Sequence, residues 1–284
     1  MEIINRRQRI FSISRKFRRE DKKVGFVPTM GALHAGHLKL VEESRRRSDI
    51  TIVSIFVNPA QFNDKADLEK YPRDLTQDAA MLAELGVDYI YAPDVEEVYP
   101  PGFSTYVDVE GLTDVMEGAS RPGHFRGVAT VVTILFNTIR PDIAFFGQKD
   151  AQQVAVIERL TRDLGFEMEI AVMPTVREAS GLAMSSRNER LSDEGREKAV
   201  VLINSLREAK KAFKNGERNA ADLAQIVRTT IEEEPSAELD YVAIVDRETL
   251  QSIEKIGDSE ALIAAAIKID DIRLIDNVIL NRKQ

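Results

Sequence analysis

The stretch PTMGALHAGHL, residues 28–38, decides the fold because it joins an apolar run to a helix pattern. The run VGFVP (24–28) precedes it, and GHLKLVEESRRRS (36–48) continues it. Open parallel sheets are built from strand, loop and helix in this order, and they bind ligands at the carboxyl ends of their strands. Two of the chain's three histidines, His34 and His37, lie in this loop. The loop is therefore the first candidate binding site.

The first 175 residues repeat this alternation of apolar strands and helices. Further strands are predicted at 49–59, 87–93, 104–109, 142–150 and 167–174, and further helices at 74–86, 126–141 and 151–165. In the second of these helices the apolar residues recur at i, i+3, i+4, i+7, i+8 and i+11, namely Val128, Val131, Val132, Leu135, Phe136 and Ile139. That spacing is the apolar stripe of an amphipathic helix. Buried strands between helices predict an α/β fold, a parallel sheet covered on both faces.

The pattern changes near residue 177. Helices are predicted at 192–216 and 219–235, and strands at 240–246, 261–269 and 272–280. The sequence thus predicts a Rossmann-like, doubly wound domain over 1–176 and a smaller α+β domain over 177–284. The basic segment 1–20 resembles an organelle transit sequence in its Arg and Ser content, but it lacks the apolar core of a secretory signal. We expect a structured first helix there, because the first strand follows without a linker.

Composition excludes several classes of function. The chain of 284 residues has no cysteine, which rules out disulfides, zinc–thiolate sites, iron–sulfur clusters and cysteine nucleophiles, and which fits a cytoplasmic protein. Its net charge of −8 argues against a nucleic-acid partner. No run approaches the roughly 18 apolar residues of a membrane helix. An anionic substrate would need a local cationic pocket.

The histidine loop has the features of a phosphate site. A helix N-terminus offers N–H groups and partial positive charge to an anion, and Gly31 and Gly36 permit close backbone approach. The imidazoles of His34 and His37 add hydrogen-bond donors. The alternative is a pair of capping or core histidines. A metal site is less favoured, because only His124 remains as a further imidazole.

Two further motifs follow predicted strands. In FVNPAQF (56–62), Asn58 and Gln61 offer neutral amides that suit a small polar substrate; a simple Asn-Pro turn is the alternative. In FFGQKDAQQ (145–153), Lys149 suits phosphate and Asp150 suits ribose hydroxyls. A helix start with Asp150 as its N-cap is the alternative there, and it is compatible with binding.

Cationic residues gather in two more loops. In VREASGLAMSSRNERLS (176–192), two serines and Arg187 can surround triphosphate oxygens, whereas the alternative is an ordinary loop. In EGASRPGHFRGVATVV (117–132), Arg121, His124 and Arg126 precede a long helix. They form a second possible anion site, or a surface loop that carries basic residues.

Five motifs in this order resemble the pantothenate synthetase (pantoate–β-alanine ligase) family of the cytidylyltransferase-like superfamily: PTMGALHAGHL, FVNPAQF, RPGHFRGVATVV, FGQKDAQQ and GLAMSSRN. HAGH stands where the superfamily has its HIGH motif, and AMSSRN where it has its mobile phosphate loop. The resemblance implies an ATP-dependent ligase that condenses pantoate with β-alanine through pantoyl adenylate, releasing pyrophosphate and AMP. It also implies Mg2+ bound through the ATP phosphates, a homodimer joined through the first domain, and a second domain that acts as a lid.

The resemblance also implies roles for individual residues. It places the ATP site at Met30, Gly31, Ala32, Leu33, His34, Ala35, Gly36, His37, Gly147, Gln148, Lys149, Asp150, Val176, Met184, Ser185, Ser186 and Arg187. His37 is the implied proton donor, assisted by His34, Lys149 and Arg187. Pantoate is expected at Asn58, Gln61 and Gln153, with Gln61 also near β-alanine. No residue of the chain is expected to bind a metal directly.

Three positions depart from the family pattern. Ala35 stands where Glu is frequent, Ala151 where an aromatic residue is frequent, and Ser180 where Asp is frequent. These departures affect expected affinities rather than the reaction. Two other functions stay open: a nucleotidyltransferase that keeps the nucleotide on its product, and a nucleotide-sensing module without turnover.

Overall fold

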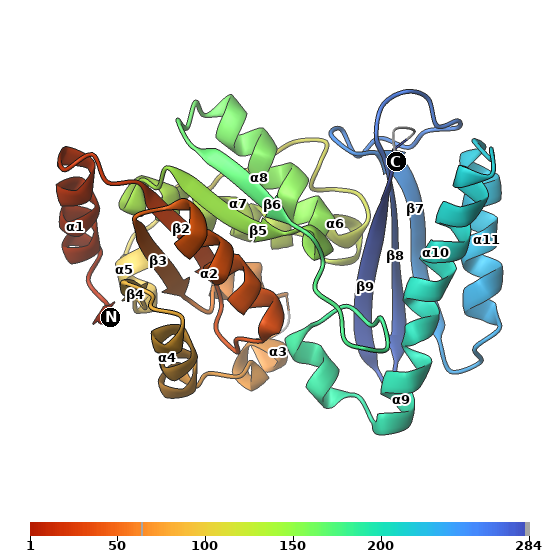
Figure 1. Cartoon of the computed structure of the whole chain (residues 1–284), viewed down its shortest axis with the longest axis horizontal. Coiled ribbons are helices and arrows are strands. Elements are labelled where there is room, and N and C mark those ends of the chain that lie inside the picture. The colour runs from red at the N-terminus through yellow and green to blue at the C-terminus, as the bar shows by residue number, and fades with distance from the viewer. Residues whose placement is uncertain (64, 282–284) are drawn as a thin grey trace. The chain divides into compact units, whose positions relative to one another are not determined.

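The computed structural model describes residues 1–63 and 65–281. The chain separates into two compact units, one of Met1–Gln148 with Val156–Pro174 and one of Lys149–Ala155 with Thr175–Gln284. Each unit has its own sheet (Figure 1). Among the described residues, no helix is long and apolar enough to cross a membrane.

The first unit is built on a six-stranded sheet with the order β1-β4-β3-β2-β5-β6. Its strands are β1 (Glu2–Ile4), β2 (Val24–Thr29), β3 (Ile50–Ile55), β4 (Tyr89–Tyr91), β5 (Ile143–Gly147) and β6 (Glu169–Met173). All neighbouring strands pair in parallel, as the sequence predicted. β2 lies at the centre, between β3 and β5, and it carries the histidine loop at its carboxyl end.

Helices lie on both faces of this sheet. They are α1 (Arg7–Arg19), α2 (Ala35–Arg47), α3 (Lys65–Lys70), α4 (Leu75–Glu84), α5 (Val95–Val98), α6 (Glu117–Ser120), α7 (His124–Ile139) and the part of α8 (Ala151–Asp163) that follows Ala155, with the 3-10 turn η1 (Pro59–Gln61). The 3-10 turn η2 (Gln148–Asp150) and the first turn of α8 lie where the chain passes into the second unit. α2 packs on β2, β3 and β5, whereas α1 and α7 pack against each other. Figure 1 shows α2 and α7 on opposite faces of the sheet.

The apolar stripe predicted in the helix after residue 126 forms part of the core. All six of its residues are buried in α7, where Phe136 stacks edge-on against Phe26 of β2 and Phe146 of β5. Full burial of an aromatic or branched side chain contributes about 1.5–3 kcal/mol. The hydrophobic effect therefore sets the position of α7 and of the loop that precedes it.

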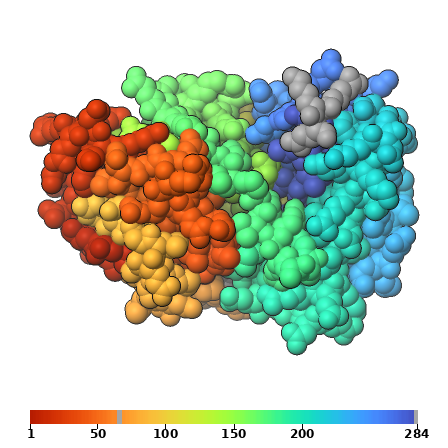
Figure 2. All heavy atoms as spheres, in the orientation of Figure 1, coloured from red at the N-terminus to blue at the C-terminus, as the bar shows by residue number. Residues whose placement is uncertain are grey.

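α2 has one buried and one charged face. Leu40, Val41 and Ser44 are buried, whereas the outer face carries ion pairs such as Lys39–Glu42, 2.5 Å apart at exposed positions. This helix lies on the surface of its unit, in orange in Figure 2. Its amphipathic pattern fixes which side of the helix faces the sheet.

Three expectations about elements need correction. Residues 104–109 form no strand, because the Val107 N–H donates to Thr130 Oγ1 of α7 (3.0 Å) and not to a neighbouring strand. The helix predicted at 192–216 is two helices, α9 (Asp193–Lys198) and α10 (Val200–Lys214), that meet at Ala199. The N-terminal segment forms the expected helix, α1, but β1 precedes it and pairs with β4.

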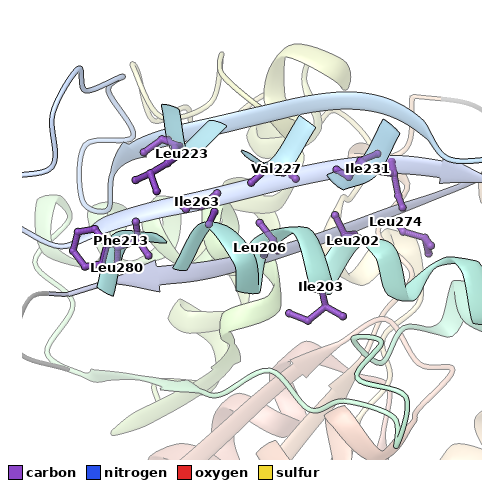
Figure 3. Packing of buried hydrophobic residues seen from close by; sticks show 14 of the residues in the cluster. Leu202, Ile203, Leu206, Phe213, Leu223, Val227, Ile231, Ile263, Leu274 and Leu280 are labelled. Atoms are coloured by element: carbon purple, nitrogen blue, oxygen red, sulfur yellow. The ribbon is translucent and has the colours of Figure 1, made fainter. Parts of the chain in front are cut away.

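The second unit is a smaller α+β structure. Besides α9 and α10 it contains α11 (Ala220–Glu232), the 3-10 turn η3 (Ser186–Arg190), and strands β7 (Glu238–Asp246), β8 (Ala261–Ile269) and β9 (Ile272–Leu280). The strands pair antiparallel in the order β7-β8-β9. Figure 3 shows Leu206 of α10 and Val227 of α11 beside Ile263 of β8 in the core between helices and sheet.

Candidate active site

Three loops of the first unit meet at the carboxyl edge of its sheet. The chain leaves β2 through α2 to reach β3 on one side, whereas β5 lies on the other side of β2. Such a change of direction is the topological switch point at which open α/β sheets bind ligands. The loop 30–34 follows β2, η1 follows β3, and Gly147 ends β5. The sequence-predicted residues of the first unit therefore share one edge.

The two histidines form a reciprocal cap on α2. His34 is the N-cap, and its Nδ1 accepts from the Gly36 N–H at 3.1 Å. In return, Nδ1 of His37 accepts from the His34 N–H at 3.4 Å. Backbone N–H groups can only donate, so both Nδ1 atoms carry lone pairs, and in each neutral ring the proton is on Nε2. The ring centroids lie 4.1 Å apart.

This geometry makes the capping and phosphate interpretations compatible. The cap uses Nδ1 of each ring, so Nε2–H is the donor of each neutral ring. Both rings are partly exposed, at a helix N-terminus that itself attracts anions. His34 and His37 can therefore donate hydrogen bonds to phosphate oxygens as neutral groups, while the cap fixes how the rings are oriented.

Asp78 of α4 holds the loop that leads to the histidines. Its buried carboxylate accepts from the N–H groups of Ala32 (3.1 Å) and Leu33 (2.9 Å). Gly31 and Ala32 adopt positive φ angles of 80° and 50°, and a Cβ at Gly31 would stand 2.8 Å from Asp78 Oδ2. Burial raises the pKa of Asp78, against the effect of the two backbone donors.

Sequence reasoning missed Asp78. It belongs to no recognised motif, and it lies 45 residues from Leu33 in the chain. The available signal was an acidic residue four positions before the buried Leu82, on the apolar face of α4. Acidic side chains are rarely buried without partners, so such a position points to a specific set of donors.

Asn58 and Gln61 form a hydrogen-bonded pair at the end of β3. Nδ2 of Asn58 donates to Gln61 Oε1 and to the Gly127 carbonyl, both at 3.1 Å. Its Oδ1 accepts from the Ala60 N–H (3.2 Å) and from the Tyr99 hydroxyl (2.8 Å). The motif therefore forms the Asn-Pro turn that was the alternative expectation from the sequence. The same Asn58 side chain also holds the amide of Gln61 in place.

The basic loop before α7 holds the backbone of Gln61. His124 is buried, and its Nδ1 lies 2.8 Å from the Gln61 carbonyl oxygen, which also accepts from Arg121 at 3.3 Å. α7 approaches η1 so closely that a Cβ at Gly127 would stand 2.3 Å from the Ala60 carbonyl oxygen. Within the first unit, the basic motif at 117–132 therefore supports the motif at 56–62.

A cavity of about 440 Å³ opens beside the histidine loop. Its walls combine apolar side chains such as Phe56 with charged ones such as Arg73 and Asp78. Met30 lines this cavity, and its sulfur accepts from Gln61 Nε2 at 2.8 Å. A volume of this size is in the range of small-molecule sites.

The second unit brings together another part of the predicted set. The Met184 N–H donates to the Val176 carbonyl at 3.0 Å, which closes a hairpin whose turn contains Gly181 at φ +100°. Ser185 then caps η3 by accepting from the Arg187 N–H at 3.2 Å. Val176 and Met184–Arg187 are thus neighbours, although they are separated in the sequence.

An ion pair supports this hairpin. Arg177 donates to both carboxylate oxygens of the buried Asp276, at 2.6 and 3.0 Å, and to the Gly181 carbonyl. The next residue, Asn277, donates through Nδ2 to the Lys149 carbonyl at 2.8 Å. Sequence reasoning missed Arg177 and Asp276, because 99 residues separate them.

The remaining predicted residues lie at the start of α8. Lys149 Nζ lies 3.5 Å from Asp150 Oδ1, in η2. Gln153 follows in the first turn of the helix and is partly exposed. In the described ranges, no group of three or more His, Asp or Glu side chains is arranged to hold a metal ion.

A family model described as pantoate–beta-alanine ligase matches residues 2–279. The chain belongs to the pantoate–beta-alanine ligase family. A pantothenate synthetase from Pelotomaculum thermopropionicum is 51% identical over 282 residues, covering 99% of this chain and 100% of the relative. One from Moorella thermoacetica is 52% identical over 263 residues, covering 93% of both chains.

Solved structures of pantoate–beta-alanine ligases share this fold. One from Thermus thermophilus matches with a TM-score of 0.90 at 45% identity, over 98% of this chain and 99% of the other. One from Francisella tularensis, complexed with beta-gamma ATP and beta-alanine, matches with a TM-score of 0.80 at 36% identity, over 98% and 97% of the two chains. The predicted family, the parallel sheet and the smaller second unit are confirmed.

Proposed function

We propose that this chain condenses pantoate with β-alanine at the expense of ATP, through a pantoyl-adenylate intermediate. The observation that carries the proposal is the reciprocal His34–His37 cap at the switch point, with Gln61 ordered at the neighbouring strand end, in a member of the pantoate–beta-alanine ligase family. The ligands named for the Francisella relative support ATP and β-alanine as substrates.

In the first step a pantoate carboxylate oxygen bonds to the α-phosphorus of ATP. The bond to the bridging oxygen breaks, and pyrophosphate leaves with the electron pair. Two anions must meet, so the site has to supply donors and positive charge. His34 and His37 donate from Nε2, and Lys149 and Arg187 supply cations. Gln61 and Gln153 orient pantoate without adding charge.

In the second step the neutral amine of β-alanine attacks the acyl carbon of the adenylate. The bond between that carbon and the AMP oxygen breaks, and the amine nitrogen loses its proton. Pantothenate and AMP are the products. We assign the ATP contacts to Met30–His37, Gly147–Asp150, Val176 and Met184–Arg187.

Magnesium enters this proposal through ATP. The described part of the chain offers no three-carboxylate or imidazole cage, and Mg2+ is commonly held by substrate phosphates and water. Lys149 and Arg187 would bind the same ATP phosphates as the magnesium ion. When bound, the ion neutralises phosphate charge.

Three features of the assembly are part of the same proposal. Residues 1–176 would hold ATP and pantoate, and 177–284 would act as a lid. The homodimer and the cytoplasmic location rest on the family resemblance, and a reaction that consumes ATP suits that compartment. Sedimentation of the full chain tests the dimer.

An isotope-exchange assay tests the function. Labelled pyrophosphate should enter ATP only when pantoate is present, and β-alanine should then release AMP. Exchange without pantoate, or equal exchange with other small carboxylates, would overturn the substrate assignment. Retention of the nucleotide on the product would indicate a nucleotidyltransferase, and binding of ATP without exchange would indicate a sensor.

A further inference from the structure

Asn58 is saturated by contacts within the protein. A side-chain amide has two N–H donors and an oxygen with two lone pairs. The donors go to Gln61 Oε1 and the Gly127 carbonyl, and the oxygen accepts from the Ala60 N–H and the Tyr99 hydroxyl. Asn58 is 1% exposed. Its side chain has no capacity left for a substrate.

Backbone groups dictate which way the Asn58 amide faces. The Ala60 N–H can only donate, so it requires the oxygen; the Gly127 carbonyl can only accept, so it requires the nitrogen. These two partners therefore decide which end of the Asn58 amide is Oδ1 and which is Nδ2. Asn58 consequently donates an N–H to Gln61, and Gln61 must accept it with Oε1.

This requirement sets the polarity of Gln61. With Oε1 turned to Asn58, Nε2 points to Met30 Sδ, 2.8 Å away. Met30 begins the loop that leads to the histidines. Gln61 therefore presents a donor on that side, and a donor recognises a carboxylate or hydroxyl oxygen and not an ammonium group.

Tyr99 reinforces the arrangement from behind. It follows α5, its ring contacts Phe56 and Phe103, and its hydroxyl reaches Asn58 Oδ1 at 2.8 Å. Since that oxygen only accepts, Tyr99 must donate. Burial raises the pKa of the Tyr99 hydroxyl well above its ordinary value of 10.0, so the donor keeps its proton.

We propose that Asn58 and Tyr99 are positioning residues that fix the Gln61 amide with its N–H toward pantoate, and that neither touches a substrate. This inference deepens the proposed function and rests on it. It also assigns Gln61 to an oxygen acceptor of pantoate and away from the ammonium group of β-alanine.

The first test is Tyr99→Phe in the full-length enzyme. The KM for pantoate should rise about five-fold, the effect of one hydrogen bond, while the KM values for ATP and β-alanine stay unchanged. Tyr91→Phe is the control, because Tyr91 is also a tyrosine of the first unit, is more deeply buried than Tyr99, and takes no part in the Asn58 network. A lower melting temperature with no change in the pantoate KM would show a merely structural role and overturn the proposal.

The second test is a double-mutant cycle. Asn58→Asp keeps the shape and the accepting oxygen but cannot donate to Gln61, so the Gln61 amide should rotate and turn Oε1 toward pantoate. Gln61→Ala should then add almost nothing to the pantoate KM in the Asn58→Asp background. Fully additive effects would mean that Asn58 contacts pantoate itself, and would overturn the proposal.

The two proposals fail in different ways. If the unmodified enzyme shows no pantoate-dependent exchange, the proposed function has failed. If that exchange is normal and Tyr99→Phe matches Tyr91→Phe in every KM, only the positioning roles have failed. Should Asn58→Asp not fold, the Tyr99→Phe comparison still decides the question.

Discussion

The carboxylate of Asp78 accepts a 2.9 Å hydrogen bond from the backbone N–H of Leu33, next to the residue that caps α2. A second bond, to the Ala32 N–H, makes Asp78 a clamp on a loop with two left-handed residues. The position of the histidine loop thus depends on a helix that lies between β3 and β4 in the chain.

Asp78→Ala should reduce turnover at least ten-fold, because the buried N–H of Leu33 and the partly buried N–H of Ala32 lose their acceptor and the loop can move. An unsatisfied buried group costs about 1–3 kcal/mol. Asp74→Ala is the control, since Asp74 caps the same helix through the Gln77 N–H and its loss costs about 1 kcal/mol. Steady-state kinetics should show the loss of turnover in Asp78→Ala and not in Asp74→Ala, and chemical denaturation should measure the loss of stability in each variant. Equal turnover in the two variants would refute the clamp.

The raised pKa of Asp78 predicts that the free energy of unfolding depends on pH. A carboxyl group whose pKa is higher in the folded than in the unfolded state binds protons more tightly when folded. Its contribution to the free energy of unfolding is therefore greatest at low pH and declines as pH rises from about the ordinary value of 3.8 through the raised pKa. Denaturation at a series of pH values should show this decline in the wild type and not in Asp78→Ala.

His34→Asn separates capping from catalysis. Asparagine is among the best N-caps, so the melting temperature should hardly change. The variant lacks Nε2–H, so adenylate formation should slow at least ten-fold in the exchange assay. His37→Ala should slow the same step strongly with the fold intact. If His34→Asn exchanges at the wild-type rate, His34 is only a cap.

Gly127→Ala should raise the pantoate KM and destabilise the protein. Alanine normally stabilises a helix interior by about 1 kcal/mol relative to glycine, but here the new Cβ would meet the Ala60 carbonyl at 2.3 Å. η1 and Gln61 would have to move. Gly257→Ala, where nothing lies within 4 Å, is the control. A gain in stability with an unchanged pantoate KM would show that α7 and η1 can move apart without disturbing Gln61, and would contradict this prediction.

Periodicity predicted most of the fold, because long apolar stripes such as that of α7 leave one possible face for burial. It missed β1, which has three residues and a single buried side chain, Ile4. It predicted a strand around Val107, because an apolar alternation does not reveal that the backbone N–H bonds to Thr130.

Motifs predicted the loop residues of the candidate site better than the residues that hold those loops in place. His34, Gln61 and Met184 stand in recognisable motifs, and each lies in a loop at a strand end or hairpin. Asp78 and Tyr99 act through tertiary contacts across 45 and 41 residues. No local pattern encodes such a contact.

The central claim is that a pantoate carboxylate oxygen becomes bonded to the α-phosphorus of ATP. It can be tested with pantoate whose carboxylate carries a heavy oxygen isotope, in a full turnover with ATP and β-alanine. The account predicts one labelled oxygen in the phosphate of AMP, found by mass spectrometry. Label that stays entirely in pantothenate and water, or that appears in pyrophosphate or inorganic phosphate, would contradict it.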